Sequence, residues 1–497
     1  MPYSTWMLSV VELMVVASGQ EELRTRLSRL ANGVLGLIIE LTSRPVTSAT
    51  WFVFEQKLAA LLREFGREIT EWVANGLEED SPAVVQQAGG GEWRRRSDKT
   101  PNRDVATLFG TIVLWRHAYR AKDEACLFPL EESLGLIASC TPAFAERASW
   151  LMSQAGATQR LVLDRLKRDH AVTLGATRLR KLCEGVAGSL TPLRREFQTA
   201  RVCALLRQAS GSKGRHKPVL AVGRDGITVG HTSGCFEVAS CATVSVFDRR
   251  GKRLGTVCLG FAPEPGQKTM TRELKALIVS VLSEWDGPAP RLCYVSDAGD
   301  LESGFYTRHL SRMRDPRSGR RLKWQRVVDF YHASERISTL AACLNLSPTK
   351  AREWSARMRR VLKEGRGVSR LLHSAAALKK RHGLHSGQAA AYRTATQYLR
   401  SRSHWMCYAE FRRLGLPIGS GVTEGCCKTL FTARVKQSGM RWSHSGLQTM
   451  LDLRMLTLSG IWDGIYMASL NTSRHLSLTV PTTTPRPVTP KQRLNAA

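Results

Sequence analysis

The sequence is poor in acidic residues, in cysteine and in long apolar runs. Only 42 Asp and Glu stand against 73 Lys and Arg in 497 residues, a formal charge of +31. Twelve cysteines are too few for a disulfide scaffold of this length, so we expect reduced thiols in a bacterial cytoplasm. No run reaches the roughly 18 apolar residues of a spanning helix, so we expect no membrane association. Residues 1–23 lack a leading basic segment, and we interpret them as a helix rather than a signal peptide.

What the sequence does contain is enough apolar material for several domains and a large surplus of positive charge. Hydrophobic residues make up 43%, with 12 Trp and 14 Phe, which excludes an intrinsically disordered chain. A surface this basic repels itself unless anions neutralise it. The charge therefore predicts a polyanionic partner whose phosphates bind Lys and Arg.

The pattern of apolar residues divides the chain into regions of different character. Helical spacing is clearest at 50–72, whereas 86–104 is rich in Gly and Arg and predicts an exposed loop. The tail is rich in Thr and Pro and is expected to be disordered. The predicted regions are a helical 1–95, a β-hairpin with helices at 96–212, an α/β region at 213–345, a basic helical region at 346–415, final helices at 416–470 and the tail at 471–497.

Residues 213–345 combine β-type runs with amphipathic helices. Runs rich in Val and Thr lie at 217–228, 235–247 and 253–261, and the charged segment 248–252 suits a hairpin turn. A helix at 267–285, a strand at 292–295, a strand at 323–328 and a helix at 331–346 follow. Three successive strands followed by alternating helices and strands predict an α/β fold with a mixed sheet, part antiparallel and part parallel.

Three carboxylates in this region come directly after short apolar runs: Asp225, Asp297 and Asp329. An acid at the end of a buried strand lies where ligands gather in α/β sheets. Oxygen ligands from separate strands are what Mg²⁺ takes. Each acid alone also has a simpler explanation, since Asp225 before Gly226 suits a turn and Asp329 suits a helix N-cap.

A fourth carboxylate, Glu424, favours the functional interpretation. It lies in the first turn of a predicted helix, with Lys428, Arg434, Lys436 and Arg441 following it. An acid at this position ordinarily stabilises the helix dipole, but here basic groups suited to phosphate surround it. Acids among basic residues are typical of two-metal phosphoryl transfer, in which paired cations activate the attacking oxygen and stabilise the leaving one.

Four segments carry a resemblance to a known family. They are GRDG at 223–226, VSDAGD at 295–300, VVDFYHASERI at 327–337 and GLPIGSGVTEGCCKTLFTARVKQSGMRW at 415–442. With these motifs the sequence resembles the DDE transposases of bacterial insertion sequences, of the ISKra type, over about residues 105–465. The last segment is the most specific. The resemblance implies an RNase H-like mixed sheet with helices, interrupted by an all-α insertion at 346–415 and preceded by a mainly helical N-terminal region.

The resemblance also implies roles for individual residues. Asp225, Asp297 and Glu424 would bind two Mg²⁺ ions, which Mn²⁺ could replace, and would catalyse the cutting and joining of DNA strands. Asp329 and His332 match a D-x-x-H motif with a supporting role. Within VSDAGD, residue 300 is a second candidate for the middle acid, but Asp297 is preferred because it lies nearest the strand.

Basic residues are expected to hold DNA phosphates in two places. Those near Glu424 are Lys428, Arg434, Lys436 and Arg441. Those in the helical insertion are Arg357, Arg359, Arg360, Lys363 and Arg366, where the alternative is a solvated helical face that only keeps the protein soluble.

Together these expectations describe a nucleoid-associated DNA transposase. It would bind terminal inverted repeats of double-stranded DNA through residues 96–212 among others, act as a homo-oligomer on DNA, and join the freed 3′-hydroxyl to target DNA. Two alternatives stay open: an RNase H-like nuclease without strand transfer, and a non-catalytic DNA-binding protein derived from a transposase.

Overall fold

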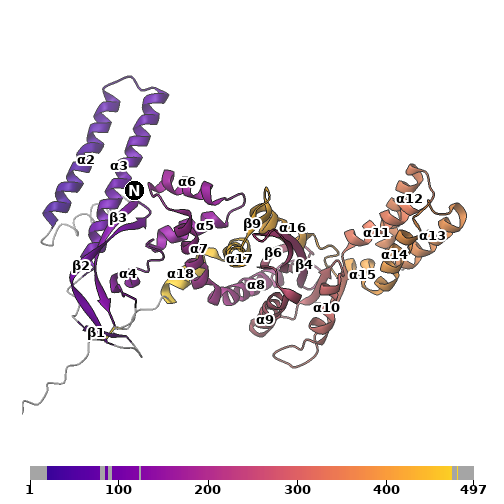
Figure 1. Ribbon diagram of the computed structural model, residues 1–497. Coiled ribbons are helices and arrows are strands. Elements are labelled where there is room, and N and C mark those ends of the chain that lie inside the picture. Colours follow the sequence, from indigo (N-terminus) through magenta and orange to yellow (C-terminus); the bar gives the residue numbers. More distant parts are fainter. Residues whose placement is uncertain are drawn as a thin grey trace, which may run out of the picture. The chain divides into compact units, whose positions relative to one another are not determined.

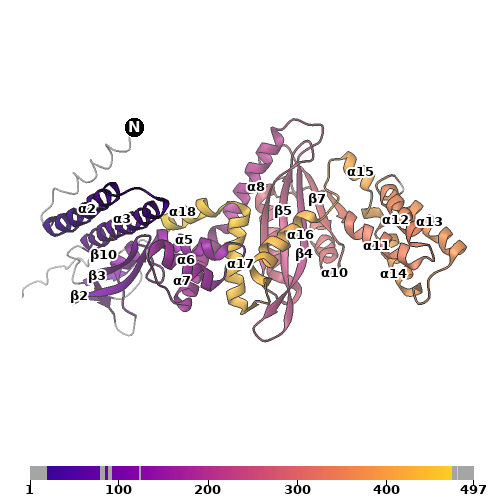
Figure 2. The ribbon, with the colours of Figure 1, turned by 90° about the horizontal axis from the view of Figure 1, so that it is seen from above.

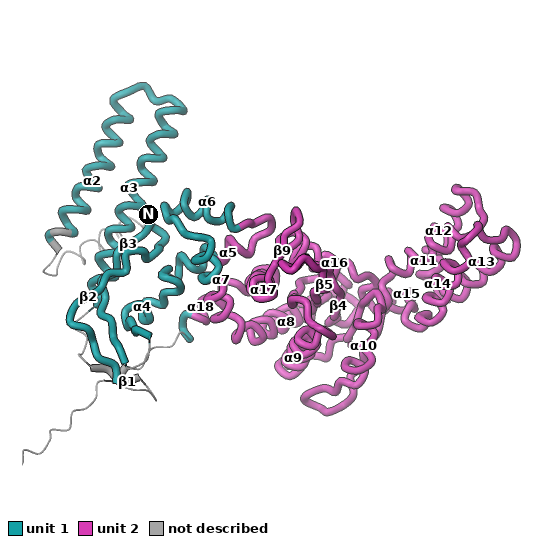
Figure 3. Tube along the Cα trace, viewed as in Figure 1, with its two compact units in different colours: residues 1–148, 159–182, 470–497 teal, residues 149–158, 183–469 magenta. Residues whose placement is uncertain are grey.

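The computed structural model describes residues 20–78, 84–87, 92–121, 125–365, 367–472 and 478–479. They form a mixed α/β protein with two separate sheets (Figures 1 and 2). The chain divides into two compact units (Figure 3): unit 1 is residues 1–148, 159–182 and 470–497, and unit 2 is residues 149–158 and 183–469. The helix expected at 1–23 lies outside the described residues up to residue 19, as does the expected tail except for 471–472 and 478–479.

Unit 1 combines long helices with an antiparallel sheet of strand order β10-β1-β2-β3. Helix α3 (Ser48–Gly76) confirms the helix predicted at 50–72. The loop predicted at 86–104 is wrong at 86–87, which end strand β1, and from residue 92, because Glu92–Thr107 forms strand β2. Half of the side chains of β2 are exposed and the apolar alternation of a strand is absent. Pairing with β3 (Gly110–Arg120) holds the strand in place. The other elements are α2 (Gln20–Thr42), β1 (Val84–Gln87), α4 (Pro129–Ser133), α6 (Gln159–His170) and β10 (Leu478–Thr479).

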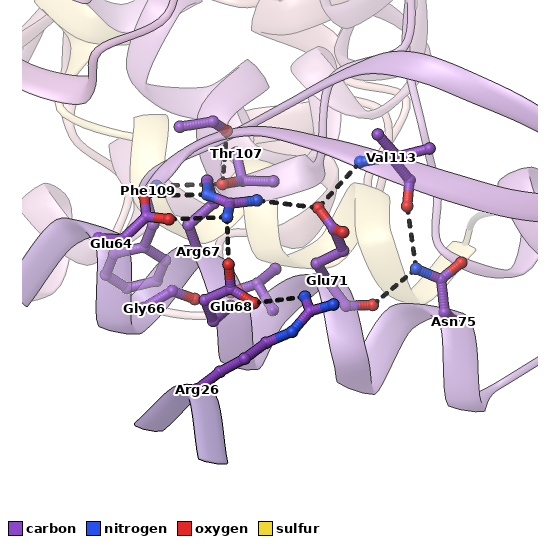
Figure 4. Close-up of polar contacts among 12 residues, drawn as sticks. Arg26, Glu64, Gly66, Arg67, Glu68, Glu71, Asn75, Thr107, Phe109 and Val113 are labelled. Atoms are coloured by element: carbon purple, nitrogen blue, oxygen red, sulfur yellow. Dashed lines mark hydrogen bonds and ion pairs between the residues drawn. The ribbon is translucent and has the colours of Figure 1, made fainter. Parts of the chain in front are cut away.

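Side chains of α3 cover the free edge of β3 (Figure 4). The Glu71 carboxylate accepts a hydrogen bond from the Val113 N–H at 3.1 Å, and Arg67 binds the same carboxylate at 3.0 Å. Asn75 accepts a hydrogen bond from the Trp115 N–H at 2.7 Å and donates one to the Val113 carbonyl at 2.9 Å. An open strand edge invites pairing with another chain, and these side chains occupy that edge instead.

Unit 2 contains the second sheet, with strand order β6-β5-β4-β7-β8. Strands β4, β5 and β6 pair antiparallel, whereas β4, β7 and β8 pair parallel. The predicted order of strands and helices and the mixed sheet are confirmed, as is the hairpin turn, in which the Asp248 N–H donates to the Lys252 carbonyl at 2.8 Å. The elements are α8 (Arg194–Ser210), β4 (Val219–His231), β5 (Phe236–Phe247), β6 (Arg253–Phe261), α9 (Lys268–Glu284), β7 (Arg291–Ser296), α10 (Asp300–Arg308), β8 (Trp324–Val328) and α11 (Phe330–Cys343).

Alternation along β4 gives this sheet two differently covered faces. Leu220 belongs to a core that includes residues of α8 and α9, whereas Val219 and Ala221 belong to a second core that includes residues of α11 and α14. Successive side chains of a strand point to opposite faces. Gly223 and Asp225 therefore lie on the same face as Ala221.

Helices follow the sheet, as predicted for residues 346–415. Trp354 is buried and donates its Nε1 hydrogen to Ser374 Oγ at 2.9 Å, so it is part of a core.

All 12 cysteines are free thiols. Among the described residues, no helix is long and apolar enough to cross a membrane. The elements are α12 (Pro348–Leu362), α13 (Gly367–His382), α14 (Ala389–Ser401), α15 (Tyr408–Arg413), α16 (Gly421–Cys427), β9 (Arg441–Trp442), α17 (His444–Ser459) and α18 (Trp462–Thr472). The division into units falls within α18 and also within α5 (Pro142–Ser153) and α7 (Ala176–Leu190).

Candidate active site

Three of the predicted acids lie at the same position along neighbouring parallel strands of the unit 2 sheet. In the two parallel pairings, Val295 of β7 is opposite Gly223 of β4 and opposite Val327 of β8. Parallel strands reach the same edge of a sheet with their carboxyl ends, where ligands bind in α/β proteins. Two residues further along the three chain segments are Asp225, Asp297 and Asp329.

Asp225 lies inside its strand and not at the end, because β4 continues beyond it. One carboxylate oxygen accepts the Gly226 N–H at 2.7 Å, and the other lies 3.7 Å from the Cys427 sulfur. Burial raises the pKa of Asp225 above its usual value, and the negative charges of Asp297 and Glu424 raise it further. The structure therefore brings the three predicted catalytic acids into one electrostatic environment.

Helix α16 carries Glu424 close to the sheet, and this is possible because residue 223 is glycine. A Cβ atom at Gly223 would lie 1.9 Å from Thr423 Oγ1, which is far too close for two atoms that are not bonded to each other. Thr423 Oγ1 in turn lies 2.8 Å from Thr243 Oγ1 of β5, within hydrogen-bond distance. As predicted, Glu424 is in the first turn of its helix. Figure 2 shows α16 lying along β4 and β5.

The surroundings of Asp297 and Asp300 favour Asp297 as the second acid. Asp297 follows β7 directly, is half-buried and accepts the Gly299 N–H at 2.9 Å. Asp300 is exposed at the first residue of α10. The negative charge of Asp297 is among the influences that raise the pKa of Asp225.

Asp329 is fully buried and serves as the N-cap of α11, as its position in the sequence suggested. One carboxylate oxygen accepts the backbone N–H groups of Tyr331 and His332, and the other accepts the backbone N–H and the hydroxyl of Ser420. The Ser420 hydroxyl also lies 2.6 Å from Glu424 Oε1. A hydroxyl has only one hydrogen to donate. The Ser420 hydroxyl therefore lies between the Asp329 and Glu424 carboxylates and can donate to one of them at a time.

The ring of His332 forms its contact with a different carboxylate. Its Nδ1 atom lies 3.1 Å from Glu335 Oε2, one turn further along α11. The D-x-x-H motif therefore contributes a buried N-cap through its Asp, whereas its His pairs with a neighbour on the same helix.

Sequence reasoning missed Glu302, which is 8% exposed in the first turn of α10. Its Oε2 atom and Asp297 Oδ1 lie 2.6 and 3.4 Å from the position that a Cβ on Gly299 would take, so the two carboxylates are neighbours. Burial raises the pKa of Glu302, and the charge of Asp297 raises it further. The available signal was a third acid in the short segment 297–302.

The basic residues expected near Glu424 differ in exposure. The prediction that Arg434 contacts DNA is wrong, because this side chain is 1% exposed and donates its Nε hydrogen to the Met152 carbonyl at 2.8 Å. The π-helical segment Lys428–Lys436, which continues α16, turns this side chain toward the core, and burial lowers the pKa of Arg434 to about 10. Lys428 and Arg441 are exposed and Lys436 is half-buried, so these three are accessible to phosphate.

The basic residues of α12 and the turn after it also divide into two groups. Arg357 and Arg360 are exposed. Arg359 donates to a serine hydroxyl of α11 at 2.7 Å, and the Lys363 ammonium lies 4.4 Å from the centre of a phenylalanine ring of α11. Arg366 lies outside the described residues. Two of the five predicted DNA contacts thus have partners within the protein.

The acids are chemically suited to bind Mg²⁺, but their side chains are not arranged to coordinate an ion together. Carboxylate oxygens are the ligands that this ion prefers, and a cation would relieve the repulsion acting on Asp225. Within the described ranges, however, no group of three or more His, Cys, Asp or Glu side chains is placed to hold a metal ion. One oxygen of Glu424 lies within hydrogen-bond distance of the Ser420 hydroxyl, at 2.6 Å.

No protein-family model matches this chain, and no curated protein matches it. The function is therefore argued from the geometry and chemistry of its own residues.

Proposed function

We propose that the protein is a DDE-type DNA transposase, which binds transposon ends, cleaves DNA phosphodiester bonds and joins the 3′-hydroxyl ends to target DNA. The observation that carries this proposal is the gathering of Asp225, Asp297 and Glu424 in a chain of charge +31. Acids held close together favour a bound cation, and a strongly basic chain favours a polyanion. Mg²⁺-dependent cleavage of nucleic acid requires both a bound cation and a polyanionic substrate.

The proposed core fold is RNase H-like. The mixed sheet β6-β5-β4-β7-β8, antiparallel in one part and parallel in the other, supports this proposal. On this proposal, helices α12–α15 are an insertion between α11 and α16. The acids of the core then come from β4, from the end of β7 and from α16, which are far apart in the sequence.

The proposed cofactor is a pair of Mg²⁺ ions, with Mn²⁺ as a substitute. Asp225 and Asp297 would hold the ions and Glu424 would complete the set. Such ions supply an activated oxygen nucleophile and stabilise the leaving oxygen. The protein's own contribution is to position these ligands: Cys427 and the Gly226 N–H fix Asp225, and Ser420 orients Glu424.

The proposed partner is double-stranded DNA, as transposon terminal inverted repeats and as target, with the protein acting as a homo-oligomer associated with the nucleoid. Lys428 and Arg441 are the exposed basic residues that follow Glu424. They are the proposed phosphate contacts at the acids. Arg357 and Arg360 are the proposed contacts in α12.

Nicking of a supercoiled plasmid that carries the DNA flanking the gene tests this proposal. We expect nicking with Mg²⁺, none with EDTA, and none for Asp225→Asn, Asp297→Asn or Glu424→Gln, each of which should still bind DNA. Asp300→Asn is the matched control, because this exposed acid should be dispensable. Nicking that persists in Asp297→Asn and disappears in Asp300→Asn would move the second ligand to Asp300.

A non-catalytic DNA-binding protein derived from a transposase is the second candidate. The observation that favours it is that no group of three or more His, Cys, Asp or Glu side chains among the described residues is placed to hold a metal ion. DNA binding without nicking under any metal condition would support it. Nicking without joined products would instead indicate a nuclease that lacks strand transfer.

A further inference from the structure

Three arginines of unit 2 lie together without acidic partners. Arg326 is on β8, Arg336 is on α11 and Arg402 directly follows α14. The Nε atom of each is buried and has no hydrogen-bond partner. Among the described residues, none of the three forms an ion pair. A buried N–H group without an acceptor costs about 1–3 kcal/mol, so the chain itself does not fully satisfy these three guanidinium groups.

The ring of Tyr398 anchors this cluster to the loop that carries Asp297. The guanidinium carbons of Arg402 and Arg336 lie 4.4 and 5.0 Å from the Tyr398 ring centre. The Tyr398 hydroxyl donates a hydrogen bond to the Asp297 backbone carbonyl at 2.8 Å. Arg402 donates another to the Ala298 carbonyl at 3.2 Å. The two arginines are therefore held beside one of the proposed catalytic acids.

Arg326 stands deeper in the same cluster. It is 4% exposed, its guanidinium carbon lies 3.5 Å from the centre of the Trp405 ring, and its Nη2 donates to Ser303 Oγ at 2.6 Å. Burial lowers the pKa of Arg326, and the positive charge of Arg402 is among the influences that lower it further. The cations therefore repel one another, and a bound anion would relieve that repulsion.

We propose that Arg336 and Arg402, supported by Arg326, bind backbone phosphate of the DNA strand that enters the site at Asp297. This inference rests on the proposed function, since that function makes DNA the source of the phosphate. Arg336 and Arg402 are half-buried, so each still presents part of its guanidinium to solvent. The planar guanidinium fork matches phosphate oxygens, and stacking on an aromatic ring holds it ready for that contact. The site would position the strand while the acids act on it.

The test compares two double variants of the full-length protein that lose the same charge. Arg336→Gln with Arg402→Gln removes the cluster, and Arg393→Gln with Arg400→Gln removes two exposed arginines of α14. Fluorescence anisotropy with a labelled DNA duplex gives the association constant over a range of salt concentrations. We expect the slope of log K against log salt to become shallower by about 0.9 per lost phosphate contact in the cluster variant, and to stay unchanged in the control.

An unchanged slope in the cluster variant, or an equal loss in both variants, would overturn the inference, because the arginines would then only pack against Tyr398. Melting temperatures show whether both variants are folded. Arg336→Gln alone is measured as well, because its described contact is only with the Tyr398 ring. Its slope should also be shallower, and a normal slope in this folded variant would contradict the proposal.

The same measurements separate this inference from the proposed function. A shallower slope in the cluster variant supports the phosphate site even where no nicking is detected, since binding alone reports it. Asp297→Asn should abolish nicking and leave the salt slope unchanged. Failure of the unmodified protein to bind DNA at any salt concentration would overturn both proposals.

Discussion

Substituting alanine for Gly223 should push α16 away from the sheet and disturb the candidate site. The added Cβ would lie 1.9 Å from Thr423 Oγ1 and 3.1 Å from Thr243 Oγ1. Neither atom can move freely, because the two hydroxyls bond to each other in a buried position. Overpacking of this kind costs about 1–3 kcal/mol. Thr423 directly precedes Glu424, so the displaced residue is the neighbour of a predicted catalytic acid.

A double-mutant cycle gives this prediction its magnitude. Thr423→Ala alone should cost about 1 kcal/mol, because it removes the hydrogen bond to Thr243. In the Gly223→Ala background the same change removes the atom at 1.9 Å and leaves Thr423 Cβ at 3.2 Å, which a shift of a few tenths of an ångström accommodates. The double variant should therefore be more stable than the sum of the single effects by about 1–2 kcal/mol, which is in the range measured for residues in contact.

Chemical denaturation followed by circular dichroism measures the cycle. Gly425→Ala is the control, because it lies in the same helix and an added Cβ there would meet nothing within 4 Å. This control should be neutral or slightly stabilising, since alanine favours a helix over glycine. Additive effects of Gly223→Ala and Thr423→Ala would refute the reasoning, because they would show that the helix does not approach the strand at this point.

Three further predictions concern charge. Because the pKa of Asp225 is raised in the folded protein, its ionised form destabilises the fold, and stability falls as pH rises through that pKa. Asp225→Asn should therefore raise the melting temperature at pH 7, whereas Asp300→Asn should not. Neither variant should raise it below pH 3. Arg434→Ala should lower the unfolding free energy by about 2–5 kcal/mol in denaturant titrations, since it empties a fully buried site, while the salt dependence of DNA binding stays the same. Reversing the exposed Arg357 and Arg360 to Glu should weaken DNA binding in anisotropy titrations without lowering the melting temperature; unchanged affinity would indicate a merely solvated face.

Local patterns in the sequence determined much of unit 2. The Val- and Thr-rich runs predicted β4, β5 and β6, and their order with the later helices predicted the mixed sheet that the structure shows. Asp329 as an N-cap and Glu424 in a first helical turn were also predictable. Each of these features depends on residues that are near one another in the chain, so spacing and residue type are sufficient to indicate it.

Only the tertiary structure decided which residues meet. Strand β2 exists because β3 pairs with it, although its charged sequence resembles a loop. Arg434 is buried because its helical segment packs on a core formed from distant segments, and Glu302 is buried although its position in the sequence suggests an exposed helical turn. The arginines around Tyr398 come from β8, α11 and the end of α14. Burial and charge repulsion depend on neighbours in space, which the order of residues along the chain does not specify.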